Sequence, residues 1–90
     1  MKNLQSEFAA HFAAMSITSL VDSFNAQVGS RAFNSARAAH DQALIAELIR
    51  RGIDVSCVYD GNRISFAHQV LLHEDGRIAE VHPDVQNVIF

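Results

Sequence analysis

The chain has a single cysteine among its 90 residues, so no disulfide can form within it. It also lacks a run of about 18 apolar residues, the length that a membrane-spanning helix needs. Near the N-terminus, Glu7 and His11 interrupt the apolar residues where a signal peptide would have its hydrophobic core. From these absences we expect a soluble, cytoplasmic protein that has no membrane partner and does not depend on oxidation.

Signatures of catalysis and cofactor binding are also missing. The sequence contains no G-x-S-x-G, Walker or G-x-G-x-x-G motif. Its histidines form no i,i+4 pair on a helix and no H-x-H pair on a strand. These histidines are His11, His40, His68, His73 and His82. We therefore expect no cofactor, no metal site and no catalytic residue, and a small anion-binding or metal-binding enzyme is kept only as a second alternative.

Positive charge is scarce. Lys and Arg number 7 against 10 Asp and Glu, which gives a net charge of −3 and a pI near 5.9. This balance argues against a protein whose main task is to neutralise phosphates or to sit on an anionic membrane. The hydrophobic fraction of 49% is nevertheless enough for a core, and a chain of this length supports one compact domain, residues 1–90.

The strongest helix signal covers residues 35–51. This stretch has no glycine or proline inside it, consists mostly of strong helix formers, and is followed by Gly52, a residue typical of helix ends. Asn34 or Ser35 is placed to cap its first turn. Shorter amphipathic patterns predict two further helices over residues 4–14 and 17–28.

Three stripes of side chains run along the helix predicted at 35–51, at about 100° per residue. The bulky stripe holds Ala38, Ile45, Leu48 and Ile49. The alanine stripe holds Ala36, Ala39, Ala43 and Ala46. The polar stripe holds Arg37, His40, Asp41, Glu47 and Arg51. We expect the first two stripes to be buried against neighbours, and the polar stripe to be solvated, with ion pairs joining Arg37 to Asp41 and Glu47 to Arg51.

After Gly52 the apolar residues recur with a period of two, which predicts strands over residues 53–59, 63–72 and 77–82. Glycine-containing turns at 60–62 and 74–76 connect them. Helices followed by strands predict an α+β domain, in which three N-terminal helices pack on one face of a three-stranded antiparallel β-meander.

The same alternation assigns side chains to the two faces of the predicted sheet. The residues expected to face the helices are Cys57, Tyr59, Ile64 and Phe66, with Cys57 as a small buried hydrophobe. The register of the third strand stays open: a two-residue turn sends Ala79 and Val81 inward, and a three-residue turn sends Ile78 inward. Pro83 ends this strand, and the apolar tail after it is expected to dock as an edge strand or a short helical turn.

The outer face of the predicted sheet consists of small, uncharged and partly apolar side chains. It lacks the Lys and Glu that keep exposed sheets from associating. The residues expected to form an interaction surface are Val58, Ala67, Gln69 and Leu71. The leading hypothesis is therefore a small non-catalytic interaction or regulatory module, which binds another protein or itself as a homodimer.

The helix predicted over 35–51 is also a candidate for two kinds of binding, of a small anion and of DNA. Its N-terminus offers backbone N–H groups to an anion, next to Arg31, Asn34, Ser35 and Arg37. The element order also resembles that of winged-helix DNA-binding domains, with this helix as the reader and the turn at 60–62 or 74–76 as the wing. Asp41 and Glu47 on the reading face match a phosphate backbone poorly, so nucleic-acid binding is the alternative and not the leading hypothesis.

Overall fold

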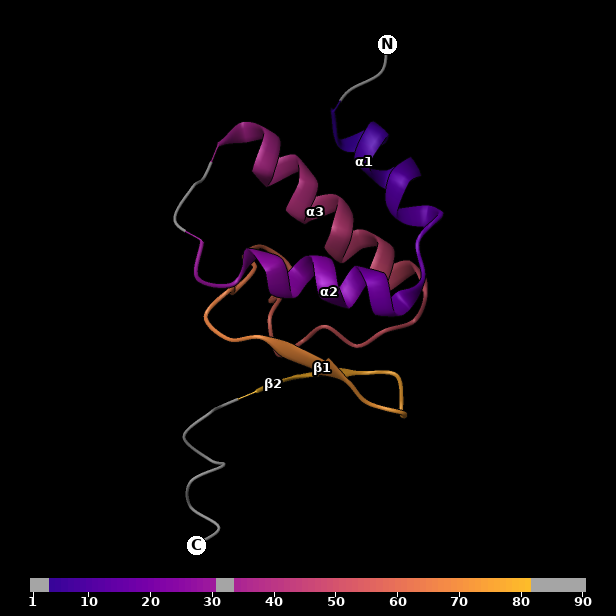
Figure 1. Cartoon of the computed structure of the whole chain (residues 1–90), viewed down its shortest axis with the longest axis vertical. Coiled ribbons are helices and arrows are strands. Elements are labelled where there is room, and N and C mark those ends of the chain that lie inside the picture. The colour runs from indigo at the N-terminus through magenta and orange to yellow at the C-terminus, as the bar shows by residue number, and fades with distance from the viewer. Residues whose placement is uncertain (1–3, 31–33, 82–90) are drawn as a thin grey trace, which may run out of the picture.

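In a computed structural model, which describes residues 4–30 and 34–81, three helices are followed by a two-stranded antiparallel sheet (Figure 1). The helices are α1 (Leu4–Ala13), α2 (Ile17–Gln27) and α3 (Ser35–Arg50), and the strands are β1 (Val70–Leu72) and β2 (Ile78–Glu80). The fold is thus α+β, and each helix begins at the residue expected from the sequence. The expectations for Arg31, His82 and the tail from Pro83 fall on residues outside the described ranges.

Side chains cap the N-terminal ends of α2 and α3, and a glycine ends α3 as the sequence indicates. The Ser16 side chain accepts a hydrogen bond from Ser19 N at 3.1 Å, and Asn34 Oδ1 accepts one from Arg37 N at 2.9 Å. At the end of α3, Gly52 takes a φ of +82°, a conformation that glycine adopts without strain. Two hydrogen bonds, from Gly52 N to Ile49 O and from Ile53 N to Leu48 O, then close the helix.

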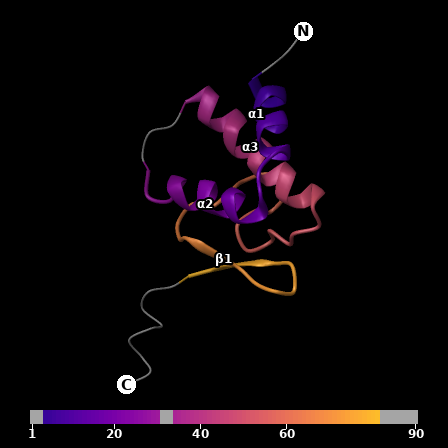
Figure 2. The same ribbon diagram turned by 45° about the vertical axis from the view of Figure 1, so that its right-hand side comes forward.

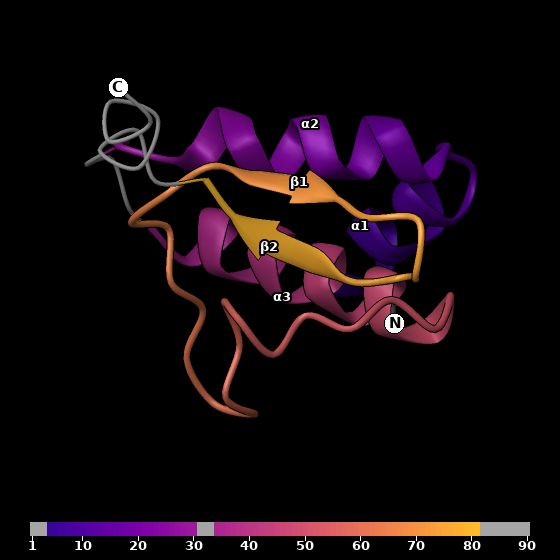
Figure 3. The ribbon, with the colours of Figure 1, turned by 90° about the horizontal axis from the view of Figure 1, so that it is seen from below.

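α1 and α2 both pack against α3, and α2 also packs against β1. The β1–β2 hairpin lies at the end of the molecule opposite α1 (Figures 1 and 2), and from below it crosses α2 and α3 (Figure 3). The largest fully buried side chains are Phe12, Leu20, Phe24, Leu44, Ile45, Leu48 and Val70. The core therefore joins all three helices to β1.

The stripes of α3 are not buried in the way the sequence suggested. The alanine stripe is fully buried only at Ala43, which is 1% exposed, because Ala36 and Ala46 lie on the surface. Ile49 of the bulky stripe is 48% exposed. The polar stripe, expected in solvent, instead includes the buried residues Asp41 and Glu47. Glu47 lies where Arg51 reaches the end of α1, and Asp41 lies where Arg37 reaches the end of α2, beside residues 62–66.

The strand predicted over residues 53–59 does not form, and only two isolated bridges remain, a parallel one between Asp54 and Arg77 and an antiparallel one between Tyr59 and Ile64. The N–H groups of Val58 and Tyr59 both donate to Val55 O, at 3.0 and 2.9 Å, and close a helical turn. Val55 and Val58 are therefore one turn apart and both face the core, whereas Cys57 is exposed. Two expectations are thereby corrected. Cys57 was expected in the core and is exposed, and Val58 was expected on the outer face and is buried.

The other two predicted strands are present in shortened form. Residues 63–72 contribute only β1 to the sheet, plus an isolated bridge between Tyr59 and Ile64. The turn that follows β1 is the three-residue alternative, because His73 N donates to Arg77 O and residues 74–76 lie between them. Ile78 consequently faces the core, with an exposed fraction of 2%, and pairs with Leu72.

Both edges of the hairpin are covered by other parts of the chain. At β1, the Asn25 side chain accepts from Val70 N at 2.8 Å and donates to Val70 O at 3.0 Å. At β2, Ile78 N donates to Asp54 O, and the Cys57 thiol donates to Ile78 O. An incoming strand would have to displace these groups. Within the described ranges, no helix has the length and apolar character that a membrane crossing requires.

Candidate functional site

Two carboxylates lie nearly out of solvent on α3, with exposed fractions of 3% for Asp41 and 5% for Glu47. A buried carboxylate is costly unless it is paired and hydrogen-bonded. Each has an arginine one helical turn away, Arg37 for Asp41 and Arg51 for Glu47, and both ion pairs expected from the spacing are formed. The spacing predicted the pairs correctly but not their burial.

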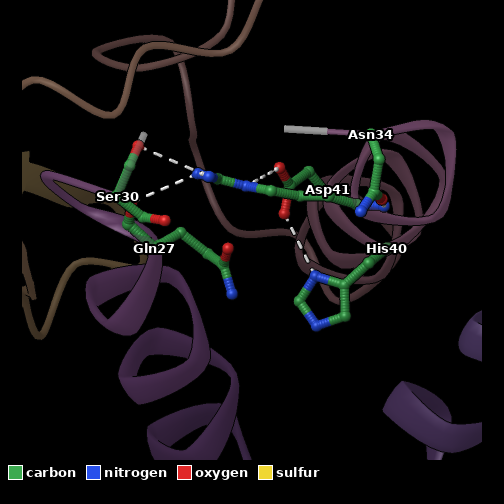
Figure 4. A network of polar contacts seen from close by, with 6 residues as sticks. Gln27, Ser30, Asn34, His40 and Asp41 are labelled. Atoms are coloured by element: carbon green, nitrogen blue, oxygen red, sulfur yellow. Dashed lines mark hydrogen bonds and ion pairs between the residues drawn. The ribbon is translucent and has the colours of Figure 1, made fainter. Parts of the chain in front are cut away.

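The Asp41 carboxylate has two partners (Figure 4). Arg37 Nε donates to Oδ2 at 3.3 Å, and His40 Nδ1 lies 3.0 Å from Oδ1. The His40 ring also meets Phe8 and Phe12 of α1 nearly edge-on, with centroids 5.1 and 5.0 Å away. His40 therefore links the buried carboxylate to α1.

Arg37 connects three segments of the chain. Besides Asp41, its guanidinium donates to the carbonyls of Gln27 and Ser30, at 3.2 and 3.4 Å, where α2 ends. It also lies over the Phe66 ring, 5.3 Å from the centroid. The guanidinium of Arg37, expected to bind an anion, is therefore bound to groups of the protein itself.

The other described members of that candidate anion site serve as a helix cap. Asn34 Oδ1 accepts from Arg37 N, and Ser35 is exposed in the first turn of α3. Arg31 lies outside the described ranges. The DNA-reading hypothesis meets a related difficulty, since both of its arginines, Arg37 and Arg51, are paired with carboxylates of their own helix.

The Glu47 carboxylate is held by two arginines. Arg50 donates to it through Nε at 2.9 Å and through a terminal nitrogen, and Arg51 Nε donates at 2.6 Å. The hydrogen bonds from Arg50 and then Arg51 lower the pKa of Glu47 from 4.5 to about 2. Arg51 also donates to the carbonyls of Phe12 and Ala13, where α1 ends.

A groove of about 430 Å³ opens beside the Asp41 network, between α3 and the loop of residues 62–66. Ala38 and Gln42 of α3 form one wall with Arg37 and Asp41, and Ser30 lies at the end of α2. The opposite wall consists of Asn62, Arg63, Ile64 and Phe66. Sequence reasoning missed this groove, because it predicted residues 63–72 as one regular strand and gave no signal that the loop would lie against α3.

The expected interaction surface is only partly assembled. Val58 is 3% exposed and belongs to the core, because the helical turn that begins at Val55 directs its side chain inward. Ala67 and Gln69 are exposed in the loop before β1, and Leu71 of β1 is 61% exposed. Leu71 is paired with Ala79 of β2, so these two side chains share the outer face of the hairpin.

The single cysteine has a structural contact. The Cys57 thiol donates to Ile78 O at 3.1 Å. Desolvation and the negative charge of Glu80 raise the pKa of this thiol, which disfavours the reactive thiolate. Among residues 4–30 and 34–81, no three His, Cys, Asp or Glu side chains are grouped as metal ligands would be.

Comparisons with known proteins add no assignment. No protein-family model, no curated protein and no solved structure matches this chain. Any function must therefore be argued from the surfaces and side chains described above.

Proposed function

We propose that this protein is a non-catalytic interaction module that binds another protein through the outer face of the β1–β2 hairpin. The observation that carries the proposal is the exposure of Leu71. Its side chain is 61% exposed, compared with 48% for Ile49 and 40% for Leu72, the other exposed large hydrophobic residues of the described ranges. Covering such a side chain removes apolar surface from water, which favours association.

The hairpin's own geometry supports docking on its face. Figure 3 looks onto this side of the hairpin, where Leu71 and Ala79 form a cross-strand pair. Asn25 occupies the backbone of β1 at Val70, and Asp54 and Cys57 occupy that of β2 at Ile78. A partner is therefore expected to contact side chains and not to add a strand.

Charge makes a second copy of the chain a poor partner for this face. Residues 69–81 carry three carboxylates, from Glu74, Asp75 and Glu80, against the single guanidinium of Arg77, which gives a net charge of −2. Two hairpins facing each other would bring like charges together. A different protein with apolar residues and a positively charged rim fits the proposal better.

The test replaces Leu71 with Lys and compares the proteins captured from a lysate of the source cells by tagged wild-type and variant chains. Ile49→Lys is the matched control, because it introduces the same charge at another exposed apolar residue, on α3. We expect a partner that wild type and Ile49→Lys retain and Leu71→Lys loses. An amide NMR spectrum of each variant establishes that the fold is kept.

Two outcomes would contradict this proposal. If Leu71→Lys retained every partner of the wild type, the hairpin face would not be the interface. Tight binding of duplex DNA at physiological salt, weakened by Arg37→Ala or Arg51→Ala, would favour the winged-helix alternative. Light scattering separately distinguishes a homodimer from a monomer that binds a different protein.

A further inference from the structure

The groove between α3 and residues 62–66 has one arginine that forms no direct ion pair with a described residue. Of the five described arginines, Arg37 pairs with Asp41, Arg50 and Arg51 pair with Glu47, and Arg77 pairs with Asp75. The remaining one, Arg63, forms no ion pair with a described residue. It lines this groove and the neighbouring one of about 320 Å³.

We propose that this groove binds a small organic anion with an apolar body, and that Arg63 holds the anionic group. The site is separate from the hairpin face and does not depend on the function proposed for that face. Its volume of about 430 Å³ falls within the range of small-molecule sites, roughly 300 to 1,000 Å³. One guanidinium at its rim suits a carboxylate or a similar single anionic group, and not a polyanion.

The position of Arg63 is fixed by its backbone. Asp60 Oδ1 accepts hydrogen bonds from Asn62 N at 2.8 Å and from Arg63 N at 2.7 Å, which closes the turn that presents the arginine. These bonds hold the Asp60 carboxylate in the turn, where its charge interacts with that of Arg63. On the α3 side, Arg37 and Asp41 neutralise each other. Arg63 is therefore the guanidinium that lines the groove without a direct ion pair.

The apolar part of the groove is preorganised. Phe66 stacks on Phe24 of α2, with ring centroids 4.7 Å apart, and lies under the guanidinium of Arg37. Ile64 packs against the core, and Ala38 on α3 contributes only a methyl group. A ligand thus meets an apolar surface whose rotamers are already set, so that little ordering opposes binding.

The experiment uses two probes that differ only in charge, 3-phenylpropionate and 3-phenylpropanamide, titrated into the 15N-labelled protein. We expect amide shifts at residues 62–66 and at Ala38 and Gln42 of the wild type, with affinity on the order of millimolar for compounds of this size. The carboxylate should bind about fivefold more tightly than the amide, as expected for one exposed charge pair. Arg63→Gln should abolish that difference, and Ala38→Leu should weaken both probes by filling the groove.

Arg77→Gln is the matched control, because Arg77 is also an exposed arginine but lies on the hairpin. It should leave both titrations unchanged. The proposal is overturned if neither probe shifts the groove residues, if both bind equally to the wild type, or if Arg77→Gln removes the difference as fully as Arg63→Gln. None of these results bears on Leu71, so failure here is distinguishable from failure of the hairpin proposal.

Discussion

Each half of α3 holds a buried carboxylate, and the two carboxylates are paired with different side chains. At each end a buried carboxylate pairs with an arginine one turn away, and that arginine also reaches the carbonyls that end another helix. Arg37 reaches the end of α2, and Arg51 reaches the end of α1. The partial negative charge of a helix C-terminus favours a guanidinium there. α3 thus connects to both other helices through charged side chains as well as through the core.

The ends differ in the third partner of the carboxylate. Glu47 has a second arginine, Arg50, whereas Asp41 has the His40 ring, which also contacts Phe8 and Phe12 of α1. The Asp41 end also borders the groove, and the Glu47 end does not line it. We conclude that the Glu47 end is the more purely structural of the two, and that changes there should cost more stability.

The largest effect is expected from Glu47→Gln. This change keeps the size of the side chain but leaves Arg50 and Arg51 without their carboxylate, and it weakens the connection from Arg51 to α1. Removing one member of a buried pair costs about 3 to 5 kcal/mol, and we expect about 2 to 3 kcal/mol here because Arg50 is largely in solvent. Urea unfolding measures the loss. Glu7→Gln, on the exposed side of α1, should stay within about 0.5 kcal/mol of wild type.

Between the two ends, Ala43 tests how closely α3 is covered. Ala43 is 1% exposed, so Ala43→Leu forces a bulky side chain into a packed interface, at a cost of about 2 kcal/mol. Ala46 lies on the surface of the same helix, and Ala46→Leu should change the urea midpoint little. Equal midpoints for the two variants would show that this side of α3 is not packed as described.

Asp41→Asn should be milder than Glu47→Gln, at about 1 kcal/mol, because Asp41 accepts from one arginine at 3.3 Å, whereas Glu47 accepts shorter hydrogen bonds from two arginines. The variant should mainly loosen α2, through Arg37. Hydrogen exchange measures this directly, with faster exchange expected in residues 17–27 than in α1. If Asp41→Asn proved more destabilising than Glu47→Gln, the contrast between the two ends would be wrong.

The pH dependence of stability should come partly from Glu47. Folding lowers its pKa from 4.5 to about 2, so the unfolded chain takes up the proton first as the pH falls. The stabilisation is therefore fully present above pH 4.5 and is lost as the pH falls towards 2. Over this range the wild type should lose more stability than Glu47→Gln. Parallel losses in urea titrations would contradict the assignment.

Sequence patterns predicted what depends on neighbouring residues. The helix starts, the Asn34 cap, the glycine after α3 and the ion pairs along α3 all follow from spacings of a few residues. The burial of Asp41 and Glu47 depends on where other segments of the chain pack against α3, and those positions are not encoded within α3. A stripe of charges on a helix looks the same in sequence whether water or another helix covers it.

The errors in the strands have a similar cause. Alternating residues from Ile53 to Tyr59 fit a strand, but Val55 and Val58 also fit one helical turn, and the core accepts that second arrangement. The contact of Asn25 with Val70 joins residues 45 positions apart, beyond any local pattern. The groove beside Arg63 was missed for the same reason, since its walls come from distant segments.

α3 keeps ionised carboxylates inside the fold by pairing them with arginines that also bind the carbonyls at the ends of α1 and α2. A 13C NMR titration of the Glu47 carboxyl carbon tests it most directly, with the urea-unfolded chain as reference. The folded signal should stay at its ionised position well below pH 4.5 and titrate near pH 2, whereas the unfolded signal should titrate near 4.5. A folded midpoint near 4.5 would contradict it, because Glu47 would then gain nothing from Arg50 and Arg51.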